Sequence, residues 1–259
     1  MTKEKLELNK IYNMDCLDGM KQLNENSIDL IVTSPPYNCG IEYDIYNDNK
    51  DWSEYLNWCK QWLIEIRRVL KSDGRLCLNV LMEMGIKNNK IRVSPYAEFY
   101  KLFVEVNINL FGSPVWIDNH RVKYTAWGSW LKASSPYIYN PYEVIMIGYK
   151  DIWNKQNKGE STISKEDFMI GCSGIWKLKT QTKELTKSNY HTDLPEMCIK
   201  LLSYKNDLVL DPFMGSGTTA VACKRLNRQF IGFEISKDYC DIANRRLERN
   251  PERLDRWLD

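Results

Sequence analysis

Residues 207–219, Asp-Leu-Val-Leu-Asp-Pro-Phe-Met-Gly-Ser-Gly-Thr-Thr, decide how the rest of this chain is interpreted. The apolar run before Asp211 does not alternate with polar residues, which is typical of a parallel strand covered on both faces. Gly215 and Gly217 then allow the backbone to approach a ligand closely. Because the residues that follow have helical spacing, the stretch is predicted to form a strand, a glycine-rich loop and a helix.

A second strand is expected over Gln229–Glu234, so that Glu234 lies at a strand end about 20 residues after the glycine loop, where an acid grips ribose hydroxyls. A glycine pair at a strand end can also be only a tight turn, but the whole pattern favours a cofactor site. No Lys follows the second glycine as in a P-loop, and the third glycine of the dinucleotide fingerprint is missing. A nucleoside cofactor without pyrophosphate, such as S-adenosylmethionine, therefore fits better than NAD or ATP.

The composition is that of an ordinary globular protein, with 259 residues, 43% hydrophobic and 27% charged residues and a net charge of +2. Eight cysteines without a CxxC pair, and only two histidines, argue against a metal site. The charged N-terminus does not resemble a signal peptide, and no apolar run is long enough to span a membrane. We therefore expect a cytoplasmic protein without a membrane partner.

A second motif follows the apolar run Ile28–Thr33, which is predicted to be a buried strand delivering Ser34-Pro35-Pro36-Tyr37 to the edge of a sheet where ligands bind. The prolines fix the backbone and leave carbonyls as acceptors. Ser34 Oγ and the Pro35 carbonyl can accept the two hydrogens of an exocyclic amine while Tyr37 stacks on the base. The alternative is a diproline turn with a core tyrosine; the buried strand before it and the glycine loop elsewhere favour the functional interpretation.

Together, Thr33-Ser34-Pro35-Pro36-Tyr37-Asn38 and residues 211–219 resemble the amino-group DNA methyltransferases that use S-adenosylmethionine. The tetrapeptide precedes the cofactor loop, which resembles the order of the beta class, and the resemblance covers nearly the whole chain. It implies that the catalytic residues are Ser34, Pro35, Pro36 and Tyr37. It also implies cofactor-binding residues, which are Asp15, Cys16, Asp211, Phe213, Gly215, Gly217, Thr218 and Glu234. Taken alone, Asp15 could equally be a helix N-cap.

Alternating strands and helices indicate the α/β class, with a doubly wound, mostly parallel, Rossmann-like methyltransferase sheet and helices on both faces. Helices are expected over residues 52–70 and 94–106 and a strand over 75–80, while strands at 114–117 and 143–147 are expected to form an antiparallel edge. We predict a single domain over residues 1–259, with a catalytic half at about 1–149 and a cofactor half at about 189–259. A small target-recognition insert is expected at about 150–188.

Three less regular segments lie around these motifs. Residues 38–50 form either a mobile lid near the site or plain surface. Residues 119–132 mix basic and aromatic side chains without an acid, suited either to phosphate and an extruded base or to a loop with inward-packed tryptophans. Residues 150–187 show no clear periodicity and carry eight Lys against five acids; such an excess is usually a solvated face, but the position matches the recognition segment of the family.

The leading prediction is a site-specific DNA methyltransferase acting on N4 of cytosine in a restriction–modification system. The resemblance connects Ser at the first catalytic position with cytosine N4 and Asp with adenine N6, so N6 of adenine remains the alternative. An RNA or protein-amide methyltransferase and an inactive DNA-binding module are weaker alternatives. The expected partners are double-stranded DNA with a flipped base and, as a candidate, a cognate restriction endonuclease, and the chain is expected to be a monomer or a homodimer.

Overall fold

The computed structural model describes residues 6–85, 92–117, 128–138, 140–179, 186 and 190–248. The strands in this part are β1 (Lys10–Asn13), β2 (Ile28–Thr33), β3 (Leu70–Leu81), β4 (Met84–Gly85), β5 (Arg92–Val93), β6 (Asn109–Gly112), β7 (Val115–Ile117), β8 (Tyr142–Tyr149), β9 (Ile175–Trp176), β10 (Leu208–Asp211) and β11 (Gln229–Glu234). The helices are α1 (Cys16–Met20), α2 (Trp52–Val69), α3 (Pro95–Glu105), α4 (Lys165–Gly171), α5 (Asp193–Leu202), α6 (Thr218–Arg225) and α7 (Lys237–Glu248).

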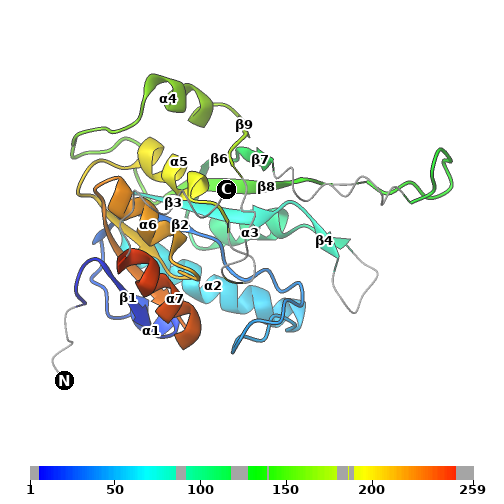
Figure 1. The fold of residues 1–259 in the computed structure, drawn as a ribbon, viewed down its shortest axis with the longest axis horizontal. Helices are drawn as coiled ribbons and strands as arrows, with labels where there is room; N and C mark the ends of the chain where they lie inside the picture. Colours follow the sequence, from blue (N-terminus) through cyan, green and yellow to red (C-terminus); the bar gives the residue numbers. More distant parts are fainter. Residues whose placement is uncertain are drawn as a thin grey trace.

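One sheet runs through the centre of the molecule in the order β1-β11-β10-β2-β3-β8-β7-β9, with β6 also beside β8 (Figure 1). The five strands from β1 to β3 are mutually parallel. Strand β8 then runs antiparallel to β3, and β6 and β7 run antiparallel to β8. The expected mostly parallel sheet with an antiparallel edge is therefore confirmed.

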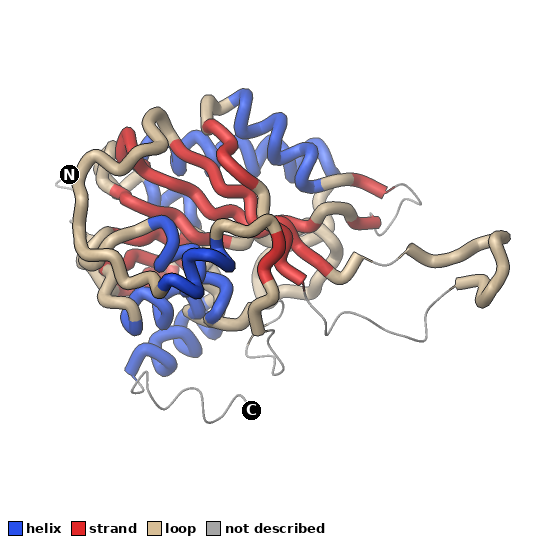
Figure 2. The backbone as a smooth tube through the Cα atoms, turned by 90° about the horizontal axis from the view of Figure 1, so that it is seen from above, coloured by secondary structure: helices blue, strands red, loops and turns tan. Residues whose placement is uncertain are grey.

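Helices cover both faces of this sheet, as Figure 2 shows. Side chains alternate along each buried strand, so that Ile31 and Leu76 pack with α1, α2 and α3, whereas Leu30 and Cys77 pack with α5, α6 and α7. Because both faces are buried, the central residues of these strands are consecutive apolar residues, as in 30–32, 76–78 and 208–210, which is the pattern that predicted a doubly wound sheet.

The long helices begin at the capping residues that the sequence provides. Asp51 Oδ1 accepts a 2.9 Å hydrogen bond from Ser53 N before α2. Ser94 Oγ caps α3, where Pro95 occupies the first turn. Both helices match their predicted ranges to within about one residue at each end, which is the usual precision of helix boundaries.

Residues 150–187 contain more regular structure than the lack of periodicity suggested. Helix α4 and strand β9 both lie in this segment, and β9 extends the sheet parallel to β7. The short helix escapes a periodicity search because its apolar residues are consecutive and exposed, namely Phe168, Met169 and Ile170. Strand β6, which was not predicted either, is only four residues long.

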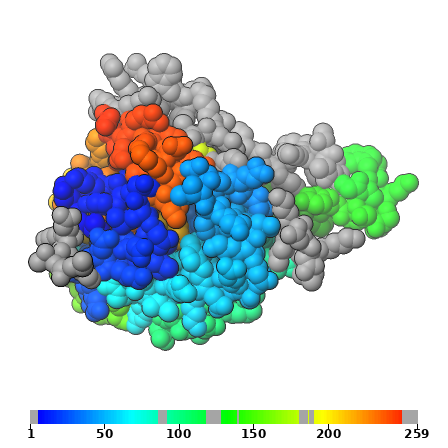
Figure 3. Space-filling model, turned by 90° about the horizontal axis from the view of Figure 1, so that it is seen from below, coloured from blue at the N-terminus to red at the C-terminus, as the bar shows by residue number. Residues whose placement is uncertain are grey.

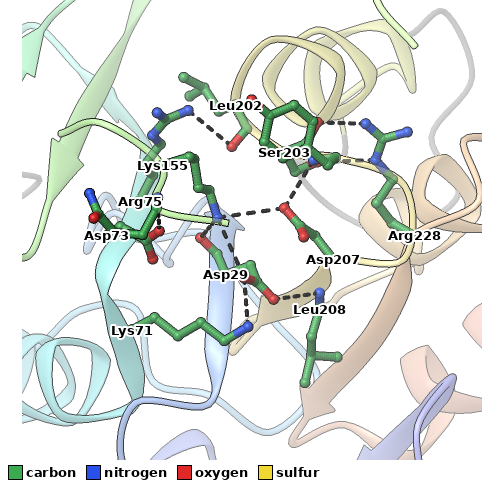
Figure 4. A network of polar contacts seen from close by, with 12 residues as sticks. Asp29, Lys71, Asp73, Arg75, Lys155, Leu202, Ser203, Asp207, Leu208 and Arg228 are labelled. Carbon is green, nitrogen blue, oxygen red and sulfur yellow. Dashed lines mark hydrogen bonds and ion pairs between the residues drawn. The ribbon is translucent and has the colours of Figure 1, made fainter. Parts of the chain in front are cut away.

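The first part of the same segment is fastened to the edge of the sheet where the parallel strands begin (Figure 4). Lys155, whose side chain is 6% exposed, lies 3.4 Å from Asp29 Oδ1 and 3.5 Å from Asp207 Oδ2. Gln156 N donates a 2.7 Å hydrogen bond to Asp73 Oδ2. These bonds hold residues 150–156 against the starts of β2 and β10, at the opposite edge from the strand ends that carry the two motifs.

Candidate functional site

The two motifs meet at one edge of the sheet because β2 and β10 are neighbouring parallel strands, with Leu30 paired with Val209. Thr33, the last residue of β2, donates a 2.7 Å hydrogen bond from its Oγ1 to Oδ1 of Asp211, the last residue of β10. Beyond these strand ends, Ser34 and Gly215 line the same pocket. Two peptides about 180 residues apart in the sequence are thus brought to one place, as expected for open α/β sheets.

The pocket has a volume of about 280 Å³, near the lower end of the roughly 300–1,000 Å³ typical of small-molecule sites. The N-terminal segment, residues 34–58 and residues 212–239 meet around it on the face shown in Figure 3. Its walls combine apolar and aromatic groups with a few carboxylates. The lining includes Met14, Asp15, Cys16, Asp44, Tyr46, Trp58, Phe213, Phe233 and Glu234.

Asp211 is 1% exposed and lies behind this lining. Its Oδ1 accepts hydrogen bonds from Thr33 and from the backbone of Phe213, and its Oδ2 accepts a 2.7 Å bond from Thr219 Oγ1. Burial raises the pKa of Asp211 to about 6, although these hydrogen bonds oppose the rise. The structure therefore places Asp211 as the joint between the two motifs, holding the loop from below.

The glycine loop turns towards Glu234, the last residue of β11. Gly215 N donates a 2.7 Å hydrogen bond to Glu234 Oε2, and Ser236 N donates a 2.8 Å bond to Oε1. Gly215 and Gly217 have φ values of 53° and 81°, in the left-handed region that favours glycine. A side chain on Gly217 would come 2.8 Å from Ala243 Cβ on α7, whereas Gly215 faces the pocket.

Helix α7 also fixes the loop through a buried arginine. Arg246 donates from Nη1 to the Ser216 carbonyl at 2.5 Å and lies 3.2 Å from Thr218 Oγ1. Burial lowers the pKa of Arg246 to about 10. Thr218, the first residue of α6, lines the pocket, while Gly217 lies behind it.

Asp15 caps a helix and also lines the pocket, so its position agrees with both interpretations that the sequence left open. Its Oδ1 accepts a 2.8 Å hydrogen bond from Leu17 N, so Asp15 caps the short helix α1. Asp15 and the buried Cys16 also line the pocket, far from the glycine loop in the sequence but beside it in space, because β1 pairs with β11. Burial raises the pKa of the Cys16 thiol far above its usual value, so it remains protonated.

The predicted catalytic tetrapeptide lies at the end of β2, with Ser34 and Pro36 in the pocket lining. Pro35 is buried, and the Pro36 carbonyl accepts a 2.8 Å hydrogen bond from Tyr55 of α2. Tyr37 is 8% exposed and lies behind the lining. Its hydroxyl is 2.8 Å from Ser34 Oγ, so the two functional side chains of the motif are in contact.

The hydroxyl of Tyr37 also reaches two polar residues that no sequence motif singled out. It donates a 3.0 Å hydrogen bond to Glu143 Oε2 and accepts one of 3.1 Å from Asn79 Nδ2. Glu143 is 2% exposed on β8 and Asn79 is 3% exposed on β3, and the Asn79 amide also donates to Glu143. A lone acid within the apolar stretch 143–147 was the only available signal.

The loop at residues 38–50 is internally braced and bonded to the cofactor half. Asp48 is buried and accepts backbone hydrogen bonds from Asn38, Cys39 and Ile41. Asp44 Oδ2 accepts a 2.7 Å bond from Ser236 Oγ, two residues after Glu234. The loop therefore lies over the pocket and contributes Tyr43, Asp44, Ile45, Tyr46 and Lys50 to its lining.

Of the basic and aromatic stretch at 119–132, residues 119–127 lie outside the described part of the chain. The described residues 128–138 form a turn that projects from the body (Figures 1 and 2). Within it, Trp130 is 64% and Leu131 86% exposed. This turn belongs to the connection between β7 and β8. Strand β8 begins at Tyr142, and its next residue, Glu143, pairs with the end of β3. The connection therefore leaves the sheet at the edge that carries the pocket.

Among the described residues, no group of His, Cys, Asp and Glu side chains is arranged to hold a metal ion. The helices of the described chain are also too short or too polar to cross a membrane.

The fold and the pocket define an α/β enzyme with a nucleoside-cofactor site at the carboxyl ends of its strands. A family model for DNA methylases matches residues 28–245, so the chain belongs to this family of N6- and N4-directed enzymes.

Individual relatives agree with the family. The type II methyltransferase M.MjaVI of Methanocaldococcus jannaschii is 38% identical over 192 residues, which cover 70% of this chain and 96% of the relative. M.BglII of Bacillus subtilis is 29% identical over 264 residues, which cover 96% of this chain and 71% of the relative.

Solved structures share the fold. TTHA0409 of Thermus thermophilus, in complex with S-adenosyl-L-methionine, has a TM-score of 0.73 and 22% identity and covers 92% of both chains. The cytosine-N4-specific PvuII DNA methyltransferase has a TM-score of 0.73 and 20% identity, covering 95% of this chain and 89% of that one.

Proposed function

We propose that this DNA methyltransferase transfers a methyl group from S-adenosylmethionine to the N4 amine of cytosine within a specific site in duplex DNA. The observation that carries the proposal is the meeting of Ser34 with the loop of Phe213 and Gly215 in one pocket. Membership of the family gives the reaction class. Serine, rather than aspartate, at the first position of the tetrapeptide favours cytosine over adenine, although both amines need the same two acceptors.

The pocket fits S-adenosylmethionine, which supplies an electrophilic methyl group when bound. Glu234 uses one lone pair of each oxygen on a backbone N–H, which leaves others for ribose hydroxyls. The Tyr46 hydroxyl is buried without a hydrogen-bond partner among the described residues, as expected of a group that awaits a polar ligand. Phe213 offers apolar surface to the adenine, and Asp15 and Cys16 belong to the same pocket lining.

Catalysis is assigned to the turn Ser34–Tyr37. Ser34 Oγ and the Pro35 carbonyl orient the amine by accepting its two hydrogens, and Pro36 keeps the turn rigid. Alignment of the nitrogen with the methyl group supplies much of the rate. Tyr37 is bonded through its hydroxyl and is only 8% exposed, so its ring stacks on a base only if the turn adjusts when the base enters.

Recognition of the target site is assigned to the connection between β7 and β8 rather than to all of residues 150–188. Residues 150–156 are held at the opposite edge of the sheet, where Lys155 is buried between two carboxylates. The exposed turn at 128–138 leaves from the pocket edge, and residues 119–142 contain no acid. Such a surface suits the negatively charged duplex, from which the target base is flipped. As in the type II relatives, we propose a role in restriction–modification, with a cognate endonuclease as partner.

The test is to incubate the purified chain with mixed-sequence duplex DNA and S-adenosylmethionine carrying a labelled methyl group, and then to digest the DNA to nucleosides for mass spectrometry. The proposal predicts label in N4-methylcytosine. Label in N6-methyladenine would support the alternative substrate, and label in neither nucleoside would reject the proposal.

A further inference from the structure

The hydroxyls of Ser34 and Tyr37 form a hydrogen-bonded chain that ends at the buried carboxylate of Glu143, and the direction of donation along this chain can be assigned. The Tyr37 hydroxyl lies 3.0 Å from Glu143 Oε2 and 3.3 Å from the Asn79 carbonyl oxygen. A hydroxyl has one proton, and the shorter bond to a carboxylate is the stronger of the two. Tyr37 therefore donates to Glu143.

The direction of that bond fixes the direction of the next one. Since the single proton of Tyr37 points to Glu143, the 2.8 Å contact with Ser34 must use the proton of Ser34. The amide of Asn79 reinforces this by donating to both the Tyr37 oxygen and Glu143. Ser34 Oγ is left with free lone pairs towards the pocket, which is the state in which it can accept a hydrogen from an amine.

From this geometry we propose that Glu143 is a positioning residue and the final proton acceptor of the reaction, acting through Tyr37 and Ser34. The inference rests on the proposed function. As the amine nitrogen bonds to the methyl carbon, the carbon–sulfur bond breaks and its electron pair leaves with the sulfur. The nitrogen then gives one proton to Ser34 Oγ, Ser34 gives its own to Tyr37, and Tyr37 gives its own to the Glu143 carboxylate. Each hydroxyl ends with one proton, and Glu143 becomes neutral.

The inference also changes the role expected of Tyr37. A ring that acts only by stacking does not need its hydroxyl, whereas the proposed path passes through that oxygen. Tyr37→Phe keeps the ring and removes only the hydroxyl, and Glu143→Gln keeps the shape of the side chain and removes its charge. The two variants interrupt the same path at neighbouring atoms, so their effects should not multiply.

The experiment compares wild type, Tyr37→Phe, Glu143→Gln and the double variant by single-turnover methyl transfer to DNA at a single pH. We expect each single variant to slow transfer by about 10- to 100-fold, and the double variant to be no slower than the slower single one. The KM for DNA and the Kd for S-adenosylmethionine should stay within about twofold of wild type, so that the loss falls on the rate of methyl transfer.

The matched control is Tyr55→Phe. Tyr55 is a buried tyrosine of α2 whose hydroxyl donates a hydrogen bond to the Pro36 carbonyl of the same turn, and its removal does not interrupt the path. Because this hydroxyl lies outside the path, the effect of Tyr55→Phe should multiply with that of Glu143→Gln. The described groups that face Glu143 include Tyr37 and Asn79, and Trp116 of β7 is the residue paired with Glu143.

Wild-type rates in both single variants, or independent losses that multiply in the double variant, would overturn the inference. If Glu143→Gln does not fold, full activity of Tyr37→Phe overturns it alone. Methylation of DNA by the wild type tests the proposed function, whereas the transfer rates of the variants relative to wild type test the proton path. Each can therefore fail separately.

Discussion

Thr33 Oγ1 lies 2.7 Å from Asp211 Oδ1, and this hydrogen bond joins the strand that ends in the tetrapeptide to the strand that ends in the glycine loop. Thr33→Val removes the hydroxyl while keeping the shape of the side chain. The Asp211 oxygen then loses a buried donor, so we expect a loss of about 1–3 kcal/mol in the free energy of unfolding, measured with urea. Thr162→Val is a control at the opposite edge, where Thr162 accepts a hydrogen bond from Arg228. Thr162→Val should leave the affinity for S-adenosylmethionine unchanged, whereas Thr33→Val should lower this affinity.

The raised pKa of Asp211 predicts how stability depends on pH. A pKa of about 6 in the folded chain, against 3.8 for an ordinary Asp, means that the folded state holds the proton more tightly. The stabilising contribution of protonated Asp211 is therefore present below about pH 4 and is lost as the pH rises to about 6, by roughly 3 kcal/mol. The measurement is the unfolding free energy of wild type minus that of Asp211→Asn from pH 4 to 7. A difference that does not change with pH would contradict the assignment.

The two loop glycines are expected to fail in different ways. Valine at either position adopts an unfavourable left-handed conformation at a cost of about 1–2 kcal/mol. At Gly217 the new side chain also meets Ala243, whereas at Gly215 it enters the pocket. Gly215→Val should fold but lose binding of S-adenosylmethionine in a calorimetric titration, and Gly217→Val should lower the melting temperature further. Normal cofactor binding by folded Gly215→Val would count against the loop assignment.

The bond between Asp44 and Ser236 predicts a role for the loop over the pocket. Ser236→Ala removes the 2.7 Å hydrogen bond that ties this loop to the cofactor half, and such a bond contributes about 1 kcal/mol. We expect S-adenosylmethionine to dissociate about fivefold faster in stopped-flow measurements. Because Ser236 Oγ also accepts a hydrogen bond from Tyr239 N at the start of α7, the unfolding free energy should fall by about 1 kcal/mol. Equal dissociation rates would show that the loop does not retain the cofactor.

Substitution of the buried Lys155 tests whether residues 150–156 have a structural role or a role in target recognition. Lys155→Met removes the cation that Asp29 and Asp207 share, while Asp29 keeps Lys71 at 2.7 Å, so we expect a cost of about 1–3 kcal/mol in unfolding free energy. The exposed Lys158 offers the matched control, because Lys158→Met removes the same charge without a buried partner. Sequencing of methylated DNA should find the same target site for both variants. A changed target site in Lys155→Met would show that residues 150–156 take part in recognition.

The sequence predicted those parts of the fold and site that depend on local pattern. The mostly apolar stretches at 28–33 and 207–211 predicted the parallel strands β2 and β10 because buried strands leave a local signal. Gly215 and Glu234, predicted as cofactor-binding residues, lie together in the lining of one pocket. Asp15 could not be assigned to a cap or a cofactor from its neighbours alone, and the structure gives it both positions.

Long-range pairings were not predictable in this way. Nothing near Glu143 in the sequence indicates that it contacts Tyr37, more than a hundred residues earlier, since the pairing of β8 with β3 creates that contact. Similarly, Lys155 contributed to a local excess of basic residues, but burial between two acids removes it from the surface.

The central claim is that one pocket holds both the methyl donor and the amine, with Ser34 acting on the amine alone. The most direct measurement is the single-turnover methylation rate of Ser34→Ala beside its Kd for S-adenosylmethionine. The account predicts a rate at least about 100-fold lower with the Kd unchanged within about twofold. A rate equal to wild type, or a loss of cofactor affinity as large as the loss of rate, would contradict it.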